Sequence, residues 1–164
     1  MNSRQNSRNA FNGRHELLDE VNERLLTELH RDPRLTMSEL ARRVSMSAPA
    51  VTERVQRLER AGIIEGFRML VDPAALGMPV TAFVRIKPGP GQLPKIAQEA
   101  RDNPQVSECY RITGEDCFLA KVHAASIELL EEVLDRFLLF GQTTTSIVVS
   151  EPVPARELPV RAVH

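Results

Sequence analysis

Side chains suited to contact nucleic acid recur with helical spacing in residues 47–57. Five of these residues would share the outward face of one helix: Pro49, Thr52, Glu53, Gln56 and Arg57. Hydroxyl, amide and guanidinium groups reach base edges and phosphates when such a helix lies in the major groove of DNA. The pattern therefore predicts a recognition helix, with Ser47 placed to cap its first turn.

Basic side chains flank this predicted face as candidate phosphate contacts. They are Arg42, Arg43, Arg54 and Arg60. Arginine binds phosphate through a planar fork of donors, so arginines around a recognition helix favour DNA binding. An amphipathic helix pair with solvated arginines is also common in proteins that bind no DNA, so the order of the surrounding elements must separate the two interpretations.

Those elements form a helix-turn-helix. A first helix is predicted over residues 37–44, where Thr36 and Glu39 have the spacing of a capping box. The helix after it has an apolar stripe formed by Val51, Val55 and Leu58. A preceding helix over residues 18–29 and an extended segment over residues 63–67 complete a winged helix-turn-helix.

The composition limits the class of protein. The chain has 164 residues, 42% of them hydrophobic, and with no Trp and one Tyr its core must be mainly aliphatic. The net charge of −1 gives no overall basic signature, so several copies of a basic surface would be needed to hold DNA at physiological salt. The sequence contains no signal peptide and no apolar run long enough to span a bilayer, which predicts a cytoplasmic protein without membrane contact.

A second domain follows a change of pattern near Asp72 and Pro73. Alternating apolar residues predict strands over residues 80–86, 106–112, 117–123 and 143–150, and helical spacing predicts helices over residues 93–101 and 127–140. This βαββαβ order is the ferredoxin-like arrangement of an α+β domain, with two helices on one face of a four-stranded antiparallel sheet. The other face has no cover within the chain, which predicts a homodimer through this domain.

The domain limits follow from these elements. Residues 1–15, rich in Asn, Ser and Arg, are expected to form a disordered basic arm. The other expected limits are 16–68 for the DNA-binding domain, 69–79 for a linker, 80–151 for the ferredoxin-like domain and 152–164 for a C-terminal tail. In the last helix Gly141 is expected to end the helix. Its expected buried stripe is Ile127, Leu130, Leu134, Phe137 and Leu138.

Several motifs together resemble one family. They are SELARRV at residues 38–44, SAPAVTERVQRLERAG at 47–62, IIEGF at 63–67, the Asp-Pro and Leu-Gly pairs at 72–77, and CYRITG at 109–114. In this order they are similar to the Lrp/AsnC, or feast/famine, transcription regulators over about residues 18–151. The resemblance implies promoter binding by homodimers that assemble into tetramers or octamers, with an amino acid or related metabolite bound between dimers.

The resemblance also implies where that effector binds. In the family, the hairpin after the Thr-Gly pair and the start of the last strand build the effector pocket. The matching positions here are Thr113, Gly114, Glu115, Asp116 and Cys117, with Thr143, Thr145 and Ser146 opposite. Hydroxyl groups suit a carboxylate and acidic groups suit an α-ammonium, so an amino acid fits this set. Many members carry an Asp where this chain has Cys117, and some work without an effector, so an effector-independent DNA-organising protein is the alternative.

Other chemistry finds little support in the sequence. Cys117 and His123 belong to one predicted strand and would lie about 20 Å apart, so we expect no catalytic residues and no enzyme. The sequence has no phosphate loop and no metal-ligand cluster, and we expect no metal and no cofactor besides an amino-acid effector. A thiol- or metal-responsive sensor that uses Cys109 and Cys117 is a further alternative, because the turn at residues 113–116 would bring the two cysteines near each other.

Overall fold

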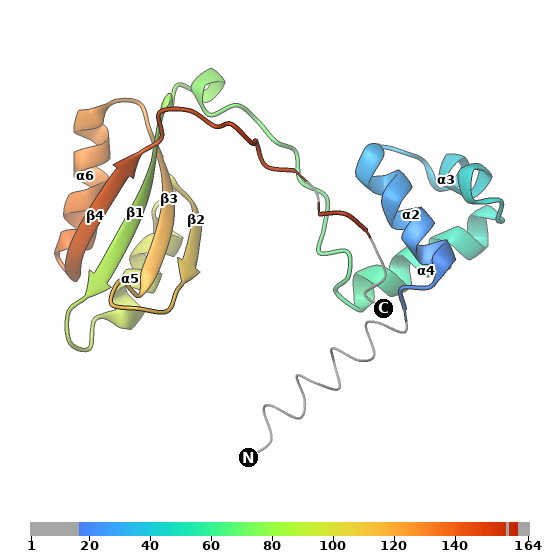
Figure 1. Cartoon of the computed structure of the whole chain (residues 1–164), viewed down its shortest axis with the longest axis horizontal. Coiled ribbons are helices and arrows are strands. Elements are labelled where there is room, and N and C mark those ends of the chain that lie inside the picture. Colours follow the sequence, from blue (N-terminus) through green and yellow to red (C-terminus); the bar gives the residue numbers. More distant parts are fainter. Residues whose placement is uncertain (1–16, 157, 161–164) are drawn as a thin grey trace, which may run out of the picture. The chain divides into compact units, whose positions relative to one another are not determined.

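The computed structural model describes residues 17–156 and 158–160 of the chain. These residues divide into two compact units, one containing residues 17–69 together with the segment from residue 155, and the other containing residues 70–154 (Figure 1). The expected basic arm, residues 1–15, lies outside the described residues. In the part of the chain that is described, no helix is long and apolar enough to cross a membrane.

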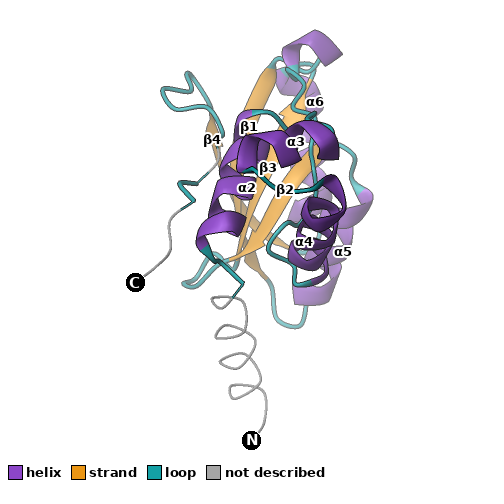
Figure 2. Ribbon diagram, turned by 90° about the vertical axis from the view of Figure 1, so that its right-hand side faces the viewer, coloured by secondary structure: helices purple, strands orange, loops and turns teal. Residues whose placement is uncertain are grey.

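The described residues of the first unit form three helices (Figure 2). They are α2 (Glu20–Arg31), α3 (Met37–Val44) and α4 (Ala48–Arg60). Each helix begins at a side-chain cap: Asp19 accepts from the Asn22 N–H, Thr36 forms the predicted capping box with Glu39, and Ser47 accepts from the Ala50 N–H. Helix α2 begins and ends two residues later than expected, because Asp19 caps it.

The turn between α3 and α4 brings the two helices into one core. Ser45 lies in the left-handed region with φ of 57°, and the Met46 N–H donates to the Ala41 carbonyl at 2.9 Å. This bond closes the end of α3 and reverses the chain within a few residues. The core that results contains Leu25, Leu29, Leu35, Leu40, Ala41, Val44, Val51 and Val55. Residues 63–67, the expected extended wing, begin with a bend at residues 63–64 and form no strand within the described residues.

The second unit is the predicted ferredoxin-like α+β domain (Figure 1). Its elements are η1 (Ala74–Leu76), β1 (Val80–Pro88), α5 (Leu93–Asp102), β2 (Val106–Arg111), β3 (Phe118–Ala124), α6 (Ile127–Leu138) and β4 (Gly141–Ile147). The sheet order is β2-β3-β1-β4 and all neighbouring strands are antiparallel. Strand β1 therefore lies inside the sheet, while β2 and β4 form its edges.

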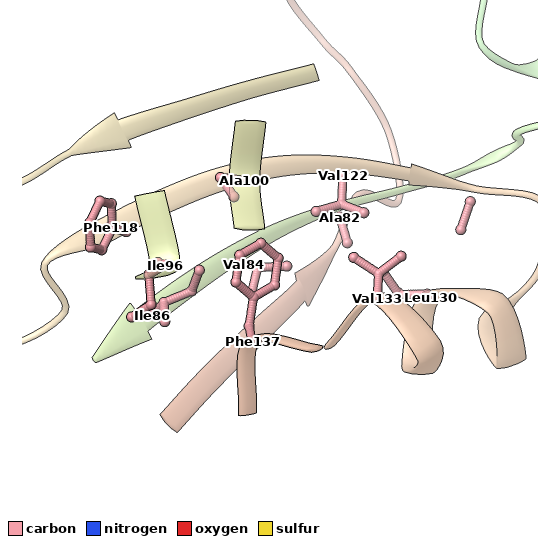
Figure 3. Packing of buried hydrophobic residues seen from close by; sticks show 12 residues of the cluster. Ala82, Val84, Ile86, Ile96, Ala100, Phe118, Val122, Leu130, Val133 and Phe137 are labelled. Carbon is pink, nitrogen blue, oxygen red and sulfur yellow. The ribbon is translucent and has the colours of Figure 1, made fainter. Parts of the chain in front are cut away.

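The core of this unit lies between one face of the sheet and the two helices. Figure 3 shows Phe137 of α6 and Ile96 of α5 packed against Val84 and Ile86 of β1, and all four side chains are fully buried. The expected stripe of α6 was partly wrong. The buried residues of α6 are Leu130, Val133 and Phe137, whereas Leu134 is half-buried and Ile127 and Leu138 are exposed. The helix is turned so that a narrower stripe contacts the sheet.

Gly141 does not end α6, contrary to expectation. The helix ends at Leu138, and Gly141 is the first residue of β4, paired with Pro88. A Cβ atom on Gly141 would lie 2.3 Å from the Lys87 carbonyl oxygen, so the close approach of two strands requires glycine here. Strand β4 accordingly begins two residues earlier than predicted and ends at Ile147 rather than at residue 150.

We therefore expect Gly141→Ala to lower the free energy of unfolding by about 1–3 kcal/mol, because the added methyl group forces β4 away from β1. Gly89→Ala is the matched control, since its Cβ would meet the Phe140 carbonyl oxygen at an ordinary 3.4 Å. Urea unfolding followed by circular dichroism measures both variants. Equal stability of the two would contradict the close approach.

Candidate functional site

The outward face of α4 carries most of the predicted recognition residues. Pro49, Glu53, Gln56 and Arg57 are exposed. The Arg57 guanidinium donates to the Glu53 carboxylate at 2.7 Å, one helical turn earlier. Thr52 is half-buried, and its hydroxyl donates to the Ala48 carbonyl at 2.9 Å. The face therefore presents the Gln56 amide and the Arg57 guanidinium to solvent. Ser47 is the N-cap of this helix, as predicted.

Two arginines of α3 lie at the end of the helix that precedes the turn. Arg43 pairs with Glu28 of α2 at 2.8 Å, and its hydrogen bond holds the pKa of the Glu28 carboxyl below its usual value. Arg42, and likewise Arg60 at the end of α4, is exposed. Neither forms an ion pair within the described residues. Of the predicted phosphate contacts, Arg42 and Arg60 are therefore the two whose guanidinium groups have no carboxylate partner among the described residues.

Arg54 has a different position from the other predicted DNA contacts. Its guanidinium donates to the Asp19 carboxylate at 2.7 Å and to the Asn22 side-chain carbonyl at 3.1 Å. Asn22 is buried in α2 and donates in turn to the Leu17 carbonyl at 2.6 Å. This network joins the middle of α4 to the start of α2, so Arg54 positions the recognition helix.

The same network sets the charge state of Asp19. Burial raises the pKa of the Asp19 carboxyl, but hydrogen bonds from Arg54 and from the Asn22 N–H together lower it below its ordinary value. A carboxyl whose pKa falls on folding stabilises the folded state above its unfolded pKa of about 3.9, and the stabilisation is lost as the pH falls through the folded pKa.

We expect Asp19→Asn to destabilise the protein by about 0.5–1 kcal/mol at pH 7, because Asn keeps the cap but loses the charge that pairs with Arg54. The difference from the unmodified protein should shrink below about pH 4, where Asp19 itself becomes protonated. Urea unfolding at pH 7 and pH 3 measures this, with Glu20→Gln as a control that removes a carboxylate from the same helical turn. A difference that is constant with pH would exclude the ion pair.

The hairpin between β2 and β3 carries the predicted effector residues. Its ends are joined by the bond from the Ile112 N–H to the Cys117 carbonyl at 3.0 Å, and Gly114 takes a φ of 108° that favours glycine. Glu115 pairs with Lys87 of β1 at 2.7 Å, and Asp116 lies 3.8 Å from Arg85 of the same strand. Lys87 holds the pKa of the Glu115 carboxyl below its usual value.

Sequence reasoning missed both cations. Arg85 and Lys87 alternate with the buried residues of β1, so their outward orientation was readable from the sequence. Their contact with the hairpin depends on the register that pairs Ile86 with Phe118, and no local pattern specifies that register. The two acidic groups of the hairpin are therefore already neutralised within the protomer.

The predicted residues of β4 divide between the two faces of the sheet. Thr143 pairs with Ile86 and Thr145 with Val84, which places both on the helix-covered side. Ser146 pairs with Phe83 and lies on the opposite side. Because β1 separates β3 from β4, the hairpin strands and β4 are roughly 10 Å apart. Within one protomer the eight predicted effector residues do not form one pocket.

The face of the sheet away from the helices holds a cavity of about 490 Å³ within the second unit. Thr81, Phe83, Lys121 and His123 line it from the sheet, together with residues of the flanking segments 72–79 and 148–153. The two ring nitrogens of His123 lie 3.0 Å from the hydroxyls of Thr81 and Ser107. Burial, aided by Lys121 and opposed by Glu108, lowers the pKa of His123, which favours the neutral ring at pH 7.

The strand register keeps Cys109 and Cys117 apart, contrary to the expectation that the turn would bring them near each other. Both cysteines are free, and Cys109 pairs with Ala120, three residues beyond Cys117 along β3. That spacing corresponds to about 10 Å. Among the described residues, no group of three His, Cys, Asp or Glu side chains could hold a metal ion.

Models of two protein families match the chain. The Lrp/AsnC ligand binding domain matches residues 81–158, and a winged helix-turn-helix DNA-binding domain matches residues 18–65. The two matches follow each other in the order that the motifs predicted.

Related proteins match over most of their length. The chain is 35% identical to the HTH-type transcriptional regulator LrpC of Bacillus subtilis over 134 residues, which are 82% of this chain and 93% of that protein. It is 38% identical to LrpA of Mycobacterium tuberculosis over 122 residues, 74% of this chain and 81% of that protein.

Solved structures agree with these matches. The structure of LrpC from B. subtilis has a TM-score of 0.78 at 34% identity and covers 84% of this chain and 98% of that chain. The structure of the transcriptional regulator NMB0573 from Neisseria meningitidis in complex with L-Met has a TM-score of 0.80 at 26% identity. The match covers 89% of this chain and 99% of that chain.

Proposed function

The chain belongs to the Lrp/AsnC family of helix-turn-helix transcriptional regulators, and from this premise we propose that it binds promoter DNA as a homo-oligomer whose binding responds to an amino acid or a related metabolite. The protein is a regulator of transcription and not an enzyme. The observation that carries the proposal is the exposed outer face of α4, where Gln56 and Arg57 lie outside the core. The helix that carries them is held in place by its Ser47 cap and by the contacts of Arg54 with α2.

We assign separate tasks to the parts of the chain. Residues 16–68 bind DNA, residues 69–79 link the domains, residues 80–151 bind the effector and form the oligomer, and residues 152–164 form a tail. The division is supported by the two compact units and by the two family models.

In the proposed complex, α4 enters the major groove. Its outer residues Pro49, Thr52, Glu53, Gln56 and Arg57 face the bases, while Ser47, Arg42 and Arg43 lie near the phosphates. Arg43 must share its guanidinium between Glu28 and the DNA. Arg54 acts indirectly by keeping α4 against α2.

The proposed assembly is a homodimer that forms tetramers or octamers. Two features support it: within the described residues the helices of the second unit pack on one face of the sheet only, and Phe83 on the other face is 37% exposed. With a net charge of −1, a single protomer has little attraction for DNA, and joining several helix-turn-helix units on one DNA raises the affinity.

The proposed effector is an α-amino acid bound between dimers. The L-Met complex of the related regulator NMB0573 supports the ligand class. A site between dimers also accounts for the separation of the hairpin residues, Thr113, Gly114, Glu115, Asp116 and Cys117, from those of β4, Thr143, Thr145 and Ser146, because another protomer would supply the second half. Asp116, 3.8 Å from Arg85, is held more loosely than Glu115 and is the better partner for an α-ammonium.

We expect Arg57→Ala to weaken binding to the specific operator by about 1–3 kcal/mol and to relax the preference for one sequence, because a guanidinium on the recognition face reads a base edge. The matched control is Arg31→Ala, which removes the same charge from an exposed position on α2. Quantitative gel-shift titration on operator and on random DNA measures the effect. Equal losses on both DNAs would make Arg57 a phosphate contact instead.

A panel of amino acids should contain a ligand that raises the melting temperature and changes the mass measured by light scattering. Asp116→Asn should abolish both responses, because the neutral amide removes the charge that pairs with the α-ammonium. Asp102→Asn, on the exposed end of α5 where the carboxylate accepts from Gln98, is the control. A panel without any ligand, with a stable oligomer, would favour an effector-independent DNA-organising protein.

A further inference from the structure

A second cavity lies on the helix-covered side of the sheet, in a groove between α5 and the edge strand β2. Its volume is about 420 Å³, within the range of small-molecule sites, and it shares no residue with the hairpin at 113–117. Its apolar wall comes from Ala97 and Ala100 of α5 and Phe118 of β3. Two small side chains therefore leave space that a larger residue would fill.

Two guanidinium groups face this space. The Arg111 guanidinium lies 4.7 Å from the centre of the ring of the buried Phe118, which holds it against one wall. Arg101 lines the groove from the end of α5, where its one hydrogen bond among the described residues is a long one of 3.4 Å to Gln98. In the described part of the chain neither arginine forms an ion pair.

One carboxylate belongs to the lining of the groove, but it is directed elsewhere. Glu108 lies 3.8 Å from the Lys121 ammonium and accepts a hydrogen bond from the Tyr110 hydroxyl. Lys121 is its partner in the sheet register and lines the opposite face. The groove therefore retains the positive charge of two arginines beside an apolar wall.

We propose that this groove binds a small monocarboxylate, with Arg101 and Arg111 binding the carboxylate group and Ala97, Ala100 and Phe118 contacting its apolar part. Guanidinium groups bind carboxylates through paired N–H donors, and the stacking of Arg111 on Phe118 reduces the freedom lost on binding. The site would give the regulator a second ligand, separate from the amino acid proposed at the hairpin.

Cys109 provides a reporter inside the groove. It lines the cavity, and Arg101 is near enough for its charge to act on the thiol. Iodoacetate carries a carboxylate and iodoacetamide does not, and both alkylate the same thiolate. The ratio of their rates at Cys109 is therefore independent of the thiol pKa and measures the attraction of the groove for a carboxylate.

The test measures alkylation rates of the full-length protein by peptide mass spectrometry. We expect the iodoacetate-to-iodoacetamide ratio at Cys109 to fall by about tenfold in the double variant Arg101→Gln, Arg111→Gln, the lower end of the rate effects of charge-lined clefts. Each single variant should give an intermediate ratio. The ratio at Cys117, which lies outside the groove but next to Phe118, should change much less in the same samples.

A competition experiment tests binding itself. Sodium benzoate should slow the alkylation of Cys109 by iodoacetamide in the unmodified protein, relative to sodium chloride at equal ionic strength, and should have no effect in the double variant. Arg136→Gln, which removes a charge from α6 outside the groove, should behave as the unmodified protein.

Three results would overturn the proposal. The first is a ratio at Cys109 that does not depend on the two arginines. The second is a ratio that does depend on them without any protection by benzoate, which would show local charge but no site. The third is a Cys109 that neither reagent modifies, which would show that the groove is closed in the assembled protein.

Discussion

The two-residue period of β1 separates the core of the C-terminal unit from its polar chemistry. Ala82, Val84 and Ile86 are fully buried beneath the helices, and the residues between them face the other way. Among these, Arg85 and Lys87 hold the acidic hairpin. Because β1 lies inside the sheet, its burial fixes both the position of the hairpin and the exposure of the second face.

In the helix-turn-helix unit, buried and exposed side chains are separated in the same way, but with the helical period of 3.6 residues. Apolar residues of α4 enter the core, and its outer face is left without a buried contact. A helix held by one apolar stripe could still rotate, and the network from Arg54 to Asp19 and the buried Asn22 opposes this rotation. A polar link of this kind contributes little to stability at a half-exposed position, but it defines the direction in which the recognition face points.

The regulation proposed for this protein follows from the low net charge of a protomer and from an effector site that one protomer cannot form alone. In this proposal, a protomer with a net charge of −1 needs partners to hold DNA, and the proposed effector residues of the hairpin and of β4 need a second protomer to form one site. The proposal therefore couples oligomerisation, DNA binding and effector binding, so that a ligand that favours one assembly would alter the affinity for DNA.

Local patterns in the sequence were enough to predict the helix-turn-helix, the caps Thr36 and Ser47, the βαββαβ order and the family, because caps, turns and apolar periods depend on residues a few positions apart. It failed where distant segments meet. The roles of Arg54, Arg85 and Lys87, the need for Gly141 and the division of Thr143, Thr145 and Ser146 between two faces were decided by tertiary structure. Strand register and helix rotation depend on packing between segments remote in sequence, and no local spacing encodes which side chains those contacts bring together.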